Sequence, residues 1–258
     1  MIFHSAKKQH IKILIFVLVC VNFIFPPIFI NFDETVFLHK WSFPLNSIIR
    51  ALVVYALLLF IKKEDSVSLV KKMIQKEHRK DNIKYSFLTL IFLCAMSFCF
   101  SRFFAAKSFF LRPKSFLEFI YCILTFLCSA FFEETIYRIY LPHTLNEFLG
   151  ISKSSQSFLQ NSEKSSTKVS LASNKTFSSM QDKNIYKELY KSKTLLVFSE
   201  FFCILLFSLA HRYLGLFSVL YAFIAGSALR YCYKKTESLA IVLVHFFYNL
   251  FAFLSLQF

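Results

Sequence analysis

The sequence predicts an all-α, polytopic membrane protein with about seven to eight transmembrane helices. Three observations lead to this fold class. Of the 258 residues, 56% are hydrophobic and only three are glycines, which excludes general disorder. Apolar runs of about 20 residues recur along the chain, the length that crosses a bilayer as a helix. A helix also satisfies its own backbone hydrogen bonds, which lipid cannot do.

The apolar runs place the transmembrane helices in order. The first run is too long for the core of a signal peptide, so we expect it to be retained as a span. Pro26 and Pro27 are expected to end or kink it. The spans are expected at residues 11–31, 45–61, 85–104, 116 to beyond 138, 194–213, 215–233 and 237–257.

Basic segments between the spans predict the orientation. Segments 62–84 and 151–193 each hold eight Lys or Arg residues, whereas the loop 32–44 holds only Lys40. The positive-inside rule therefore places the N-terminus and both basic segments in the cytosol. A net charge of +15 fits such loops beside anionic lipid, and no nucleic-acid-binding motif accompanies it. We therefore expect the basic loops to interact with membrane lipid and not with nucleic acid.

The composition also divides the chain. Residues 1–114 read as an N-terminal transmembrane region of about three spans, and 115–258 as a second region that carries the unusual polar residues. Within the second region, a Ser- and Lys-rich insert at about 150–193 is poor in apolar residues and is expected to be disordered. The seven cysteines lie mostly within apolar runs and are expected to be small apolar fillers.

Ionisable residues are expensive inside a membrane and usually mark a function. The fourth span contains the stretch Phe131 to Arg138, with Glu133 and Glu134 side by side. On a helix Glu134 and Arg138 are four residues apart and share a face, so they can pair. Glu133 points about 100° away from Glu134 and is left free. An ordinary ion pair at a helix end is the competing interpretation.

Two further polar pairs lie in the last apolar runs. Phe207 and His211 are four residues apart, as are His245 and Asn249, so each pair shares a helix face. A carboxylate and an imidazole together can deprotonate a water molecule. A second imidazole and a carboxamide N–H can stabilise the oxyanion that develops when an amide is attacked. The set can therefore cleave a peptide bond without a Ser, Cys or Thr nucleophile, in a cavity within the membrane.

The three motifs Glu-Glu-x-x-x-Arg, Phe-x-x-x-His and His-x-x-x-Asn occur in this order on successive membrane helices. They resemble the CAAX protease and bacteriocin-processing (CPBP, Abi) family, and within it the type II CAAX prenyl endopeptidases, the Ras-converting CAAX proteases. Leu141-Pro142 after Arg138 adds to the resemblance, which covers about residues 115–255. Two departures are the long insert between the first two motifs and the lack of extra histidines around His211.

The resemblance implies an enzyme that removes the last three residues (-aaX) from prenylated CAAX proteins such as Ras-like small GTPases. Its catalytic residues would be Glu133 and His211, which activate water, with His245 and Asn249 as oxyanion stabilisers. The supporting residues would be Glu134, Arg138 and Phe207. The resemblance also implies a multi-pass protein of the endoplasmic reticulum membrane, or of the plasma membrane if the source is bacterial. No cofactor is expected.

An apolar wall around these polar residues is expected to hold the prenyl chain of the substrate. The phenylalanines that flank the motifs are Phe131, Phe132, Phe207, Phe246 and Phe247.

Three other functions remain open on the residues alone. His211 and His245 with one of the two glutamates can form a three-ligand zinc site of a metalloprotease, although the His-Glu-x-x-His motif is missing. Intramembrane Glu and His can also relay protons in a transporter, but the low glycine content disfavours this. A scaffold or immunity-type protein without peptidase activity is the third alternative.

Overall fold

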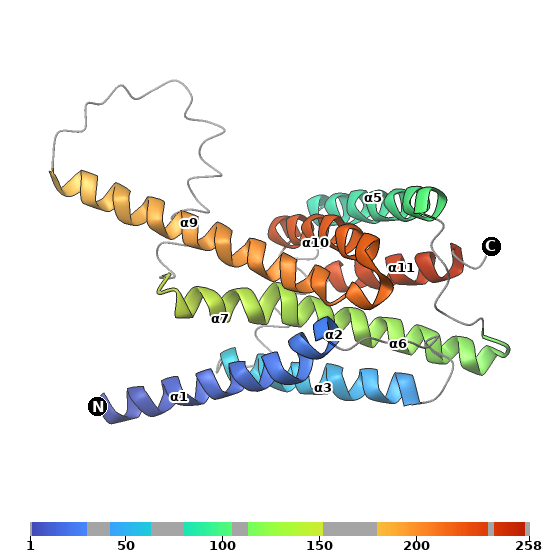
Figure 1. Ribbon diagram of the computed structural model, residues 1–258, viewed down its shortest axis with the longest axis horizontal. Helices are drawn as coiled ribbons and strands as arrows, with labels where there is room; N and C mark the ends of the chain where they lie inside the picture. The colour runs from blue at the N-terminus through green and yellow to red at the C-terminus, as the bar shows by residue number, and fades with distance from the viewer. Residues whose placement is uncertain are drawn as a thin grey trace, which may run out of the picture. The chain divides into compact units, whose positions relative to one another are not determined.

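The computed structural model describes residues 2–29, 42–62, 80–104, 113–151, 180–236 and 240–255, and every secondary-structure element in these ranges is a helix (Figure 1). The elements are α1 (Ile2–Val19), η1 (Cys20–Ile24), α2 (Phe25–Phe29), α3 (Ser42–Lys62), α5 (Lys80–Phe104), α6 (Phe116–Glu134), η3 (Thr135–Tyr140), α7 (Leu141–Phe148), α9 (Met180–Leu209), η4 (Arg212–Leu214), α10 (Leu216–Thr236) and α11 (Ala240–Ser255). The segments η1 and η3 are π-helical, and η4 is a 3₁₀-helix.

Six of the described helices are long and apolar enough to cross a membrane. They are Gln9–Phe29, Ser42–Leu59, Asn82–Phe100, Phe116–Phe148, Ser192–Leu209 and Leu216–Thr236. A seventh apolar helix, Ala240–Ser255, is shorter. Large apolar side chains lie on the outside of these helices, among them Leu216 and Phe116, as lipid-facing residues do. The predicted all-helical, polytopic membrane fold is confirmed.

The described chain forms two compact units, which we treat separately. The first comprises Met1–Tyr140 and Ile204–Phe258. In it α3 packs on α6, α11 packs on both α5 and α6, and α10 packs on α5 (Figure 1). The centre of this packing contains small residues, which let apolar helices approach closely without a strong hydrophobic driving force. Those in the core are Cys122, Ala130, Ala225 and Cys232.

All seven cysteines are free thiols, as expected for apolar fillers. Cys122, Cys203 and Cys232 are buried.

The second unit, Leu141–Cys203, contains α7 and most of α9. Helix α7 ends at Phe148, and Gly150 follows it with a φ of 68°, which suits the left-handed position after a helix. The N–H of Gly150 donates to the carbonyl of Glu147, and that of Ile151 donates to the carbonyl of Asn146. The hydroxyl of Ser199 in α9 donates to the side-chain oxygen of Asn146 at 2.6 Å, a buried hydrogen bond that joins the two helices.

The predicted disordered insert is shorter than expected at its C-terminal end. Helix α9 begins at Met180, so residues 180–193 belong to its first turns. This segment contains four Lys, one Glu and one Gln, which are good helix formers, and it is continuous with the apolar span that follows. Residues 152–179 of the insert and most of the basic segment 62–84 lie outside the described residues. The division of the chain at residue 114 and the orientation stay predictions.

Candidate active site

The two adjacent glutamates are the last residues of α6, where the helix changes from α to π geometry. The π-helical segment η3 carries Arg138 and is almost wholly buried. Such segments are rare in proteins, and those that occur often lie at functional sites, because the wider turn redirects side chains. Glu133 lies near the middle of the 33-residue helical run Phe116–Phe148, well away from either of its ends.

Glu134 and Arg138 pair as their spacing predicted. Arg138 Nε lies 3.4 Å from Glu134 Oε2, and the side chains are 2% and 1% exposed. Arg138 Nη2 also donates to the carbonyl of Gly226 on α10, at 3.5 Å. A buried carboxylate with a buried guanidinium avoids the large cost of an isolated charge in an apolar setting.

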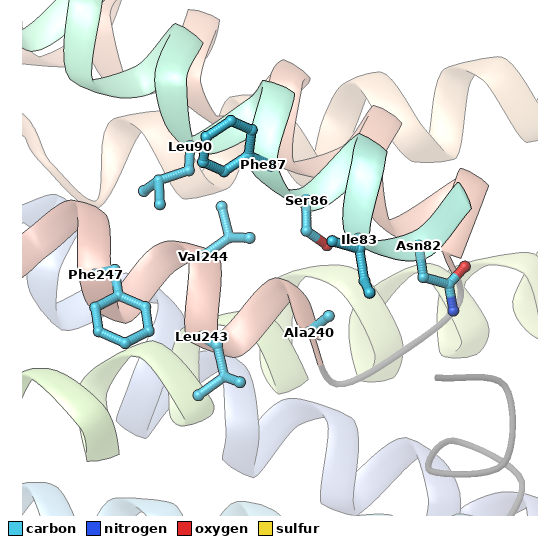
Figure 2. Close-up of a pocket in the computed structure, with 9 residues that line it drawn as sticks. All are labelled: Asn82, Ile83, Ser86, Phe87, Leu90, Ala240, Leu243, Val244 and Phe247. Carbon is cyan, nitrogen blue, oxygen red and sulfur yellow. The ribbon is translucent and has the colours of Figure 1, made fainter. Parts of the chain in front are cut away.

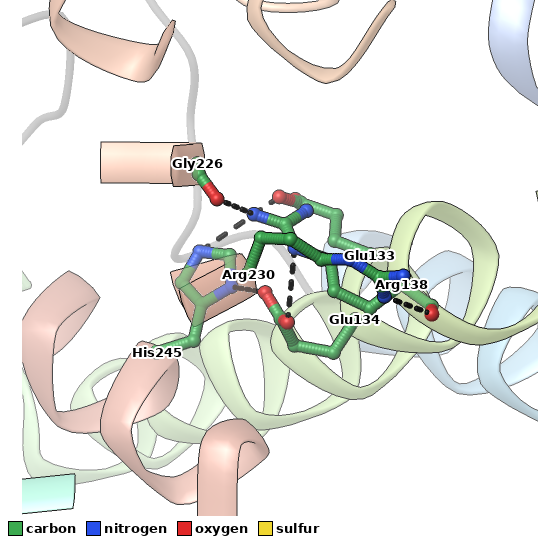
Figure 3. A network of polar contacts seen from close by, with 6 residues as sticks. All are labelled: Glu133, Glu134, Arg138, Gly226, Arg230 and His245. Atoms are coloured by element: carbon green, nitrogen blue, oxygen red, sulfur yellow. Dashed lines mark hydrogen bonds and ion pairs between the residues drawn. The ribbon is translucent and has the colours of Figure 1, made fainter. Parts of the chain in front are cut away.

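His245 of α11 lies between the two carboxylates (Figure 3). Its Nδ1 is 2.7 Å from Glu134 Oε1, and its Nε2 is 3.8 Å from Glu133 Oε2. A carboxylate can only accept, so Nδ1 carries the proton of this short hydrogen bond and Nε2 faces Glu133. Glu134 thus fixes both the tautomer and the direction of the imidazole ring.

Glu133 differs from its neighbour in having little support. Its side chain is 24% exposed, and its buried Oε2 has no hydrogen-bond partner. Glu134 Oε2 also lacks a hydrogen bond, but it is ion-paired with Arg138. A buried carboxylate oxygen without a donor is costly and calls for an explanation such as a catalytic role or a bound water. That Glu133 is the free, water-activating carboxylate stays a prediction.

Phe207 and His211 come from the end of α9 and the turn that follows it. His211 Nδ1 lies 2.9 Å from the carbonyl oxygen of Phe207, so Nδ1 carries the proton and Nε2 is left as an acceptor. The Phe207 ring is buried, with its centroid 4.8 Å from the His211 ring and 6.2 Å from the His245 ring. Phe207 therefore brings both histidines of the predicted set into one cluster.

His211 lies in the connection between the spans Ser192–Leu209 and Leu216–Thr236. Burial lowers the pKa of its imidazole, while the negative charge of Glu133 acts in the opposite direction. The lowered pKa keeps the ring neutral, which a base requires. In the described structure no hydrogen bond or ion pair joins His211 directly to Glu133. Their predicted cooperation stays a prediction.

Asn249 follows His245 by one helical turn on α11 and is half-buried. Within the described residues its carboxamide makes no hydrogen bond to the cluster. It shares the helix face of His245, as the spacing predicted, but its role is not tested by any contact.

Two residues of α10 complete the cluster, and the sequence analysis did not single them out. Arg230 Nη1 donates to the carbonyl oxygen of Arg138 at 2.8 Å, while the carbonyl of Gly226 accepts from Arg138 (Figure 3). Helix α10 and η3 thus exchange two arginine-to-carbonyl hydrogen bonds. An arginine within an apolar run, four residues after one of only three glycines, was the signal that could have found them.

The described part of the chain also has an apolar groove of about 440 Å³ between α5 and α11 (Figure 2). Its α11 wall is Ala240, Leu243, Val244 and Phe247. These positions form one stripe at helical spacing, nearly opposite His245 on the same helix. The groove is therefore separate from the polar cluster. Phe247, expected in the wall of the site, lies in this groove and is 50% exposed.

The other four phenylalanines expected in the wall of the site are buried or partly buried. Phe132, Phe207 and Phe246 are buried, and Phe131 is partly buried against the core. No group of three His, Cys, Asp or Glu side chains in the described ranges is arranged to hold a metal ion.

A known protein family matches the C-terminal part of the chain. The family described as "Rce1-like: Type II CAAX prenyl endopeptidase Rce1-like" matches residues 115–251, more than half of the chain. The matched range contains all seven residues of the three motifs. No curated protein and no solved structure matches the chain. On the strength of the family match and the motif geometry together, the chain belongs to the Rce1-like family of type II CAAX prenyl endopeptidases.

Proposed function

We propose that this protein is an intramembrane endopeptidase that removes the last three residues of prenylated CAAX proteins in the endoplasmic reticulum membrane. The Rce1-like family implies a hydrolase that acts on such proteins. The observation that carries the proposal is the unequal pair of carboxylates around His245. Glu134 is hydrogen-bonded to the ring and ion-paired with Arg138, whereas Glu133 lies 3.8 Å from Nε2 and its Oε2 makes no hydrogen bond.

Glu133 is the proposed general base. Its Oε2 and the Nε2 of His245 are 3.8 Å apart, so one water molecule can donate to both acceptors at about 2.8 Å each. Transfer of a proton to Glu133 leaves a hydroxide that attacks the carbonyl carbon of the scissile peptide. His211, neutral and with a free Nε2, assists in orienting this water. The proton on Glu133 then passes to the leaving amine.

His245 and Asn249 are the proposed oxyanion stabilisers. The proton that Glu133 takes from the water is shared with the nearby Nε2, which gives His245 imidazolium character and lets it donate from Nε2 to the oxyanion, while Nδ1–H remains bonded to Glu134. The adjacent carboxylate stabilises that imidazolium, as the aspartate does in a serine protease triad. The carboxamide N–H of Asn249 supplies the second donor from the same face of α11. Arg138 and Phe207 hold this arrangement without contacting the scissile bond.

The decisive experiment is cleavage of a farnesylated CAAX peptide by the purified full-length protein in liposomes, with release of the C-terminal tripeptide followed by mass spectrometry. We expect kcat/KM to be far lower for the same peptide without the prenyl group, because each buried CH₂ of that chain contributes about 0.8 kcal/mol to membrane partitioning. Equal kcat/KM values would leave a general intramembrane peptidase, and no cleavage of either peptide would reject the proposal.

Two additional arms address the other parts of the proposal. Incubation with a chelator, together with metal analysis of the protein, tests the zinc alternative, which predicts loss of cleavage and recovery with added Zn²⁺. Fractionation of cells that express the tagged protein tests its location. Recovery outside the endoplasmic reticulum membrane would contradict that part of the proposal alone.

A further inference from the structure

Gly226 lies in the middle of α10 and has no conformational need to be glycine. The other two glycines of the chain, Gly150 and Gly215, have φ angles of 68° and 97°, where other residues are strained. Gly226 has ordinary helical backbone, where alanine is the better helix former. Its presence therefore points to a packing constraint.

The constraint comes from Phe207. A methyl group at Gly226 would lie 2.8 Å from Cδ1 and 3.2 Å from Cε1 of the Phe207 ring, and 3.6 Å from Arg138 Nη2. Non-bonded carbon atoms prefer separations of about 3.5–4.0 Å. A side chain at Gly226 would thus force the ring to shift away from α10.

A shift of the Phe207 ring would affect the polar site, because the ring borders three polar side chains. Arg138 Cζ lies 4.0 Å from the ring centroid, in a cation–π contact. The rings of His211 and His245 are 4.8 Å and 6.2 Å away. The same residue also fixes His211 through its carbonyl oxygen. A displaced Phe207 would therefore disturb both histidines and the arginine together.

We propose that Gly226 is a positioning residue of the site. Its carbonyl accepts a hydrogen bond from Arg138 (Figure 3), and its missing side chain leaves the space that the Phe207 ring occupies. Both contacts keep the two histidines in place near Glu133. Gly226 contacts no substrate. As a statement about catalysis this inference rests on the proposed function, but the packing of Phe207 against Gly226 can be tested without any activity.

The test is a double-mutant cycle of Gly226→Ala and Phe207→Leu in the full-length protein, with kcat, KM and the unfolding temperature measured for each variant. In the wild-type background we expect G226A to lower kcat by about 10²-fold with little change in KM, the size of effect that a displacement of about 1 Å can have. In the F207L background the same substitution should cost much less, because the smaller side chain leaves room for the methyl group.

Gly215→Ala is the matched control. Its added methyl group meets nothing within 4 Å, but its φ of 97° makes the substitution strained. G215A should therefore lower the unfolding temperature by the same amount with Phe207 or with F207L. G226A should lower it with Phe207 and leave it unchanged or raised with F207L.

Each outcome decides the question. A G226A variant as active and as stable as the wild type would overturn the proposal, and so would equal losses in the two Phe207 backgrounds. If G226A does not fold, recovery of folding in the double variant supports the proposal, and failure to recover overturns it. If the wild type itself cleaves no CAAX peptide, the proposed function fails, and the thermal cycle still decides whether Gly226 leaves the space for Phe207.

Discussion

The described helices contain two π-helical segments, η1 and η3, and they have different origins. In η1 the N–H of Phe25 bonds to the carbonyl of Cys20, and the next two residues are Pro26 and Pro27. Proline lacks the N–H that an α-helix needs, so a change of helix geometry is a local response to the sequence. Segment η3 contains no proline.

Tertiary polar contacts accompany η3 in place of a proline. The carbonyl of Arg138 accepts from Arg230, and the side chain of Arg138 bonds to Glu134 and Gly226. Two long-range hydrogen bonds and an ion pair thus lie at the turn where the helix departs from α geometry. A π-helical turn that no nearby proline explains is therefore a candidate functional site. We expect substitutions around η3 to affect activity and stability strongly, and those around η1 to affect them weakly.

The largest effect is expected for Glu133→Gln, at the end of α6 just before η3. This isosteric change removes the proposed base, and loss of general base catalysis lowers kcat by about 10²–10⁴-fold. The unfolding temperature should stay close to that of the wild type, because Glu133 Oε2 has no hydrogen bond to lose. Cleavage of the farnesylated peptide and thermal unfolding of the same preparation measure the two quantities. Glu118→Gln, on the exposed first turn of the same helix, is the control and should keep full activity.

The partner prediction concerns His211→Ala, which should also abolish cleavage while membrane insertion remains intact. Because the two residues are proposed to act on one water, the combination of both substitutions should be little worse than either alone. Full activity in H211A would remove His211 from the catalytic set. Multiplicative losses would show that the two residues act in separate steps.

The second largest effect is expected for Glu134→Gln, and here stability falls as well. The change leaves the buried Arg138 guanidinium without its counter-charge, and breaking a buried pair typically costs about 3–5 kcal/mol. It also weakens the hydrogen bond that orients His245. A chemical-denaturation midpoint compared with that of E133Q measures the difference between the two neighbours. Combining E134Q with Arg138→Met should recover part of the stability, since no unpaired charge is then buried.

The sequence predicted the fold class and the first motif well, and the physical reasons are local. Apolar runs reveal helices in lipid, and the spacing of four residues determines that Glu134 meets Arg138. The position of His245 between two carboxylates depends on how α11 packs against α6, which periodicity does not encode. Phe247, two residues after His245, was expected in the apolar wall of the site and instead lines the groove between α5 and α11.

The two α10 residues were missed for a different reason. Gly226 and Arg230 match no recognisable motif, and their partners are backbone carbonyls and a ring that lie far away in sequence. Nor could the sequence reveal η3, because the segment has no Pro or Gly that interrupts an α-helix.

A moderate effect is expected for Arg230→Leu, which removes the hydrogen bond to the carbonyl of Arg138 and thereby tests the tertiary support of η3. Hydrogen bonds from charged donors contribute about 1.5–3 kcal/mol, so unfolding should become easier by about that amount, with a partial loss of cleavage. Lys235→Gln, near the end of the same helix, should change neither quantity. An R230L variant as stable and as active as the wild type would show that η3 does not depend on α10.

The smallest effect is expected when Pro26 and Pro27 are both replaced by alanine. The change restores two N–H donors and lets η1 relax toward an ordinary α-helix, with a stability change within about 1 kcal/mol. The Phe23 ring, which packs edge-on against Phe132 beside Glu133 at 5.4 Å, would then move, so a slight fall in kcat is expected. Hydrogen exchange over residues 20–27 reports the relaxation, and the cleavage assay reports its consequence. A loss of activity as large as that of E133Q would mean that η1 also shapes the site, and the difference between the two π-helical segments would disappear.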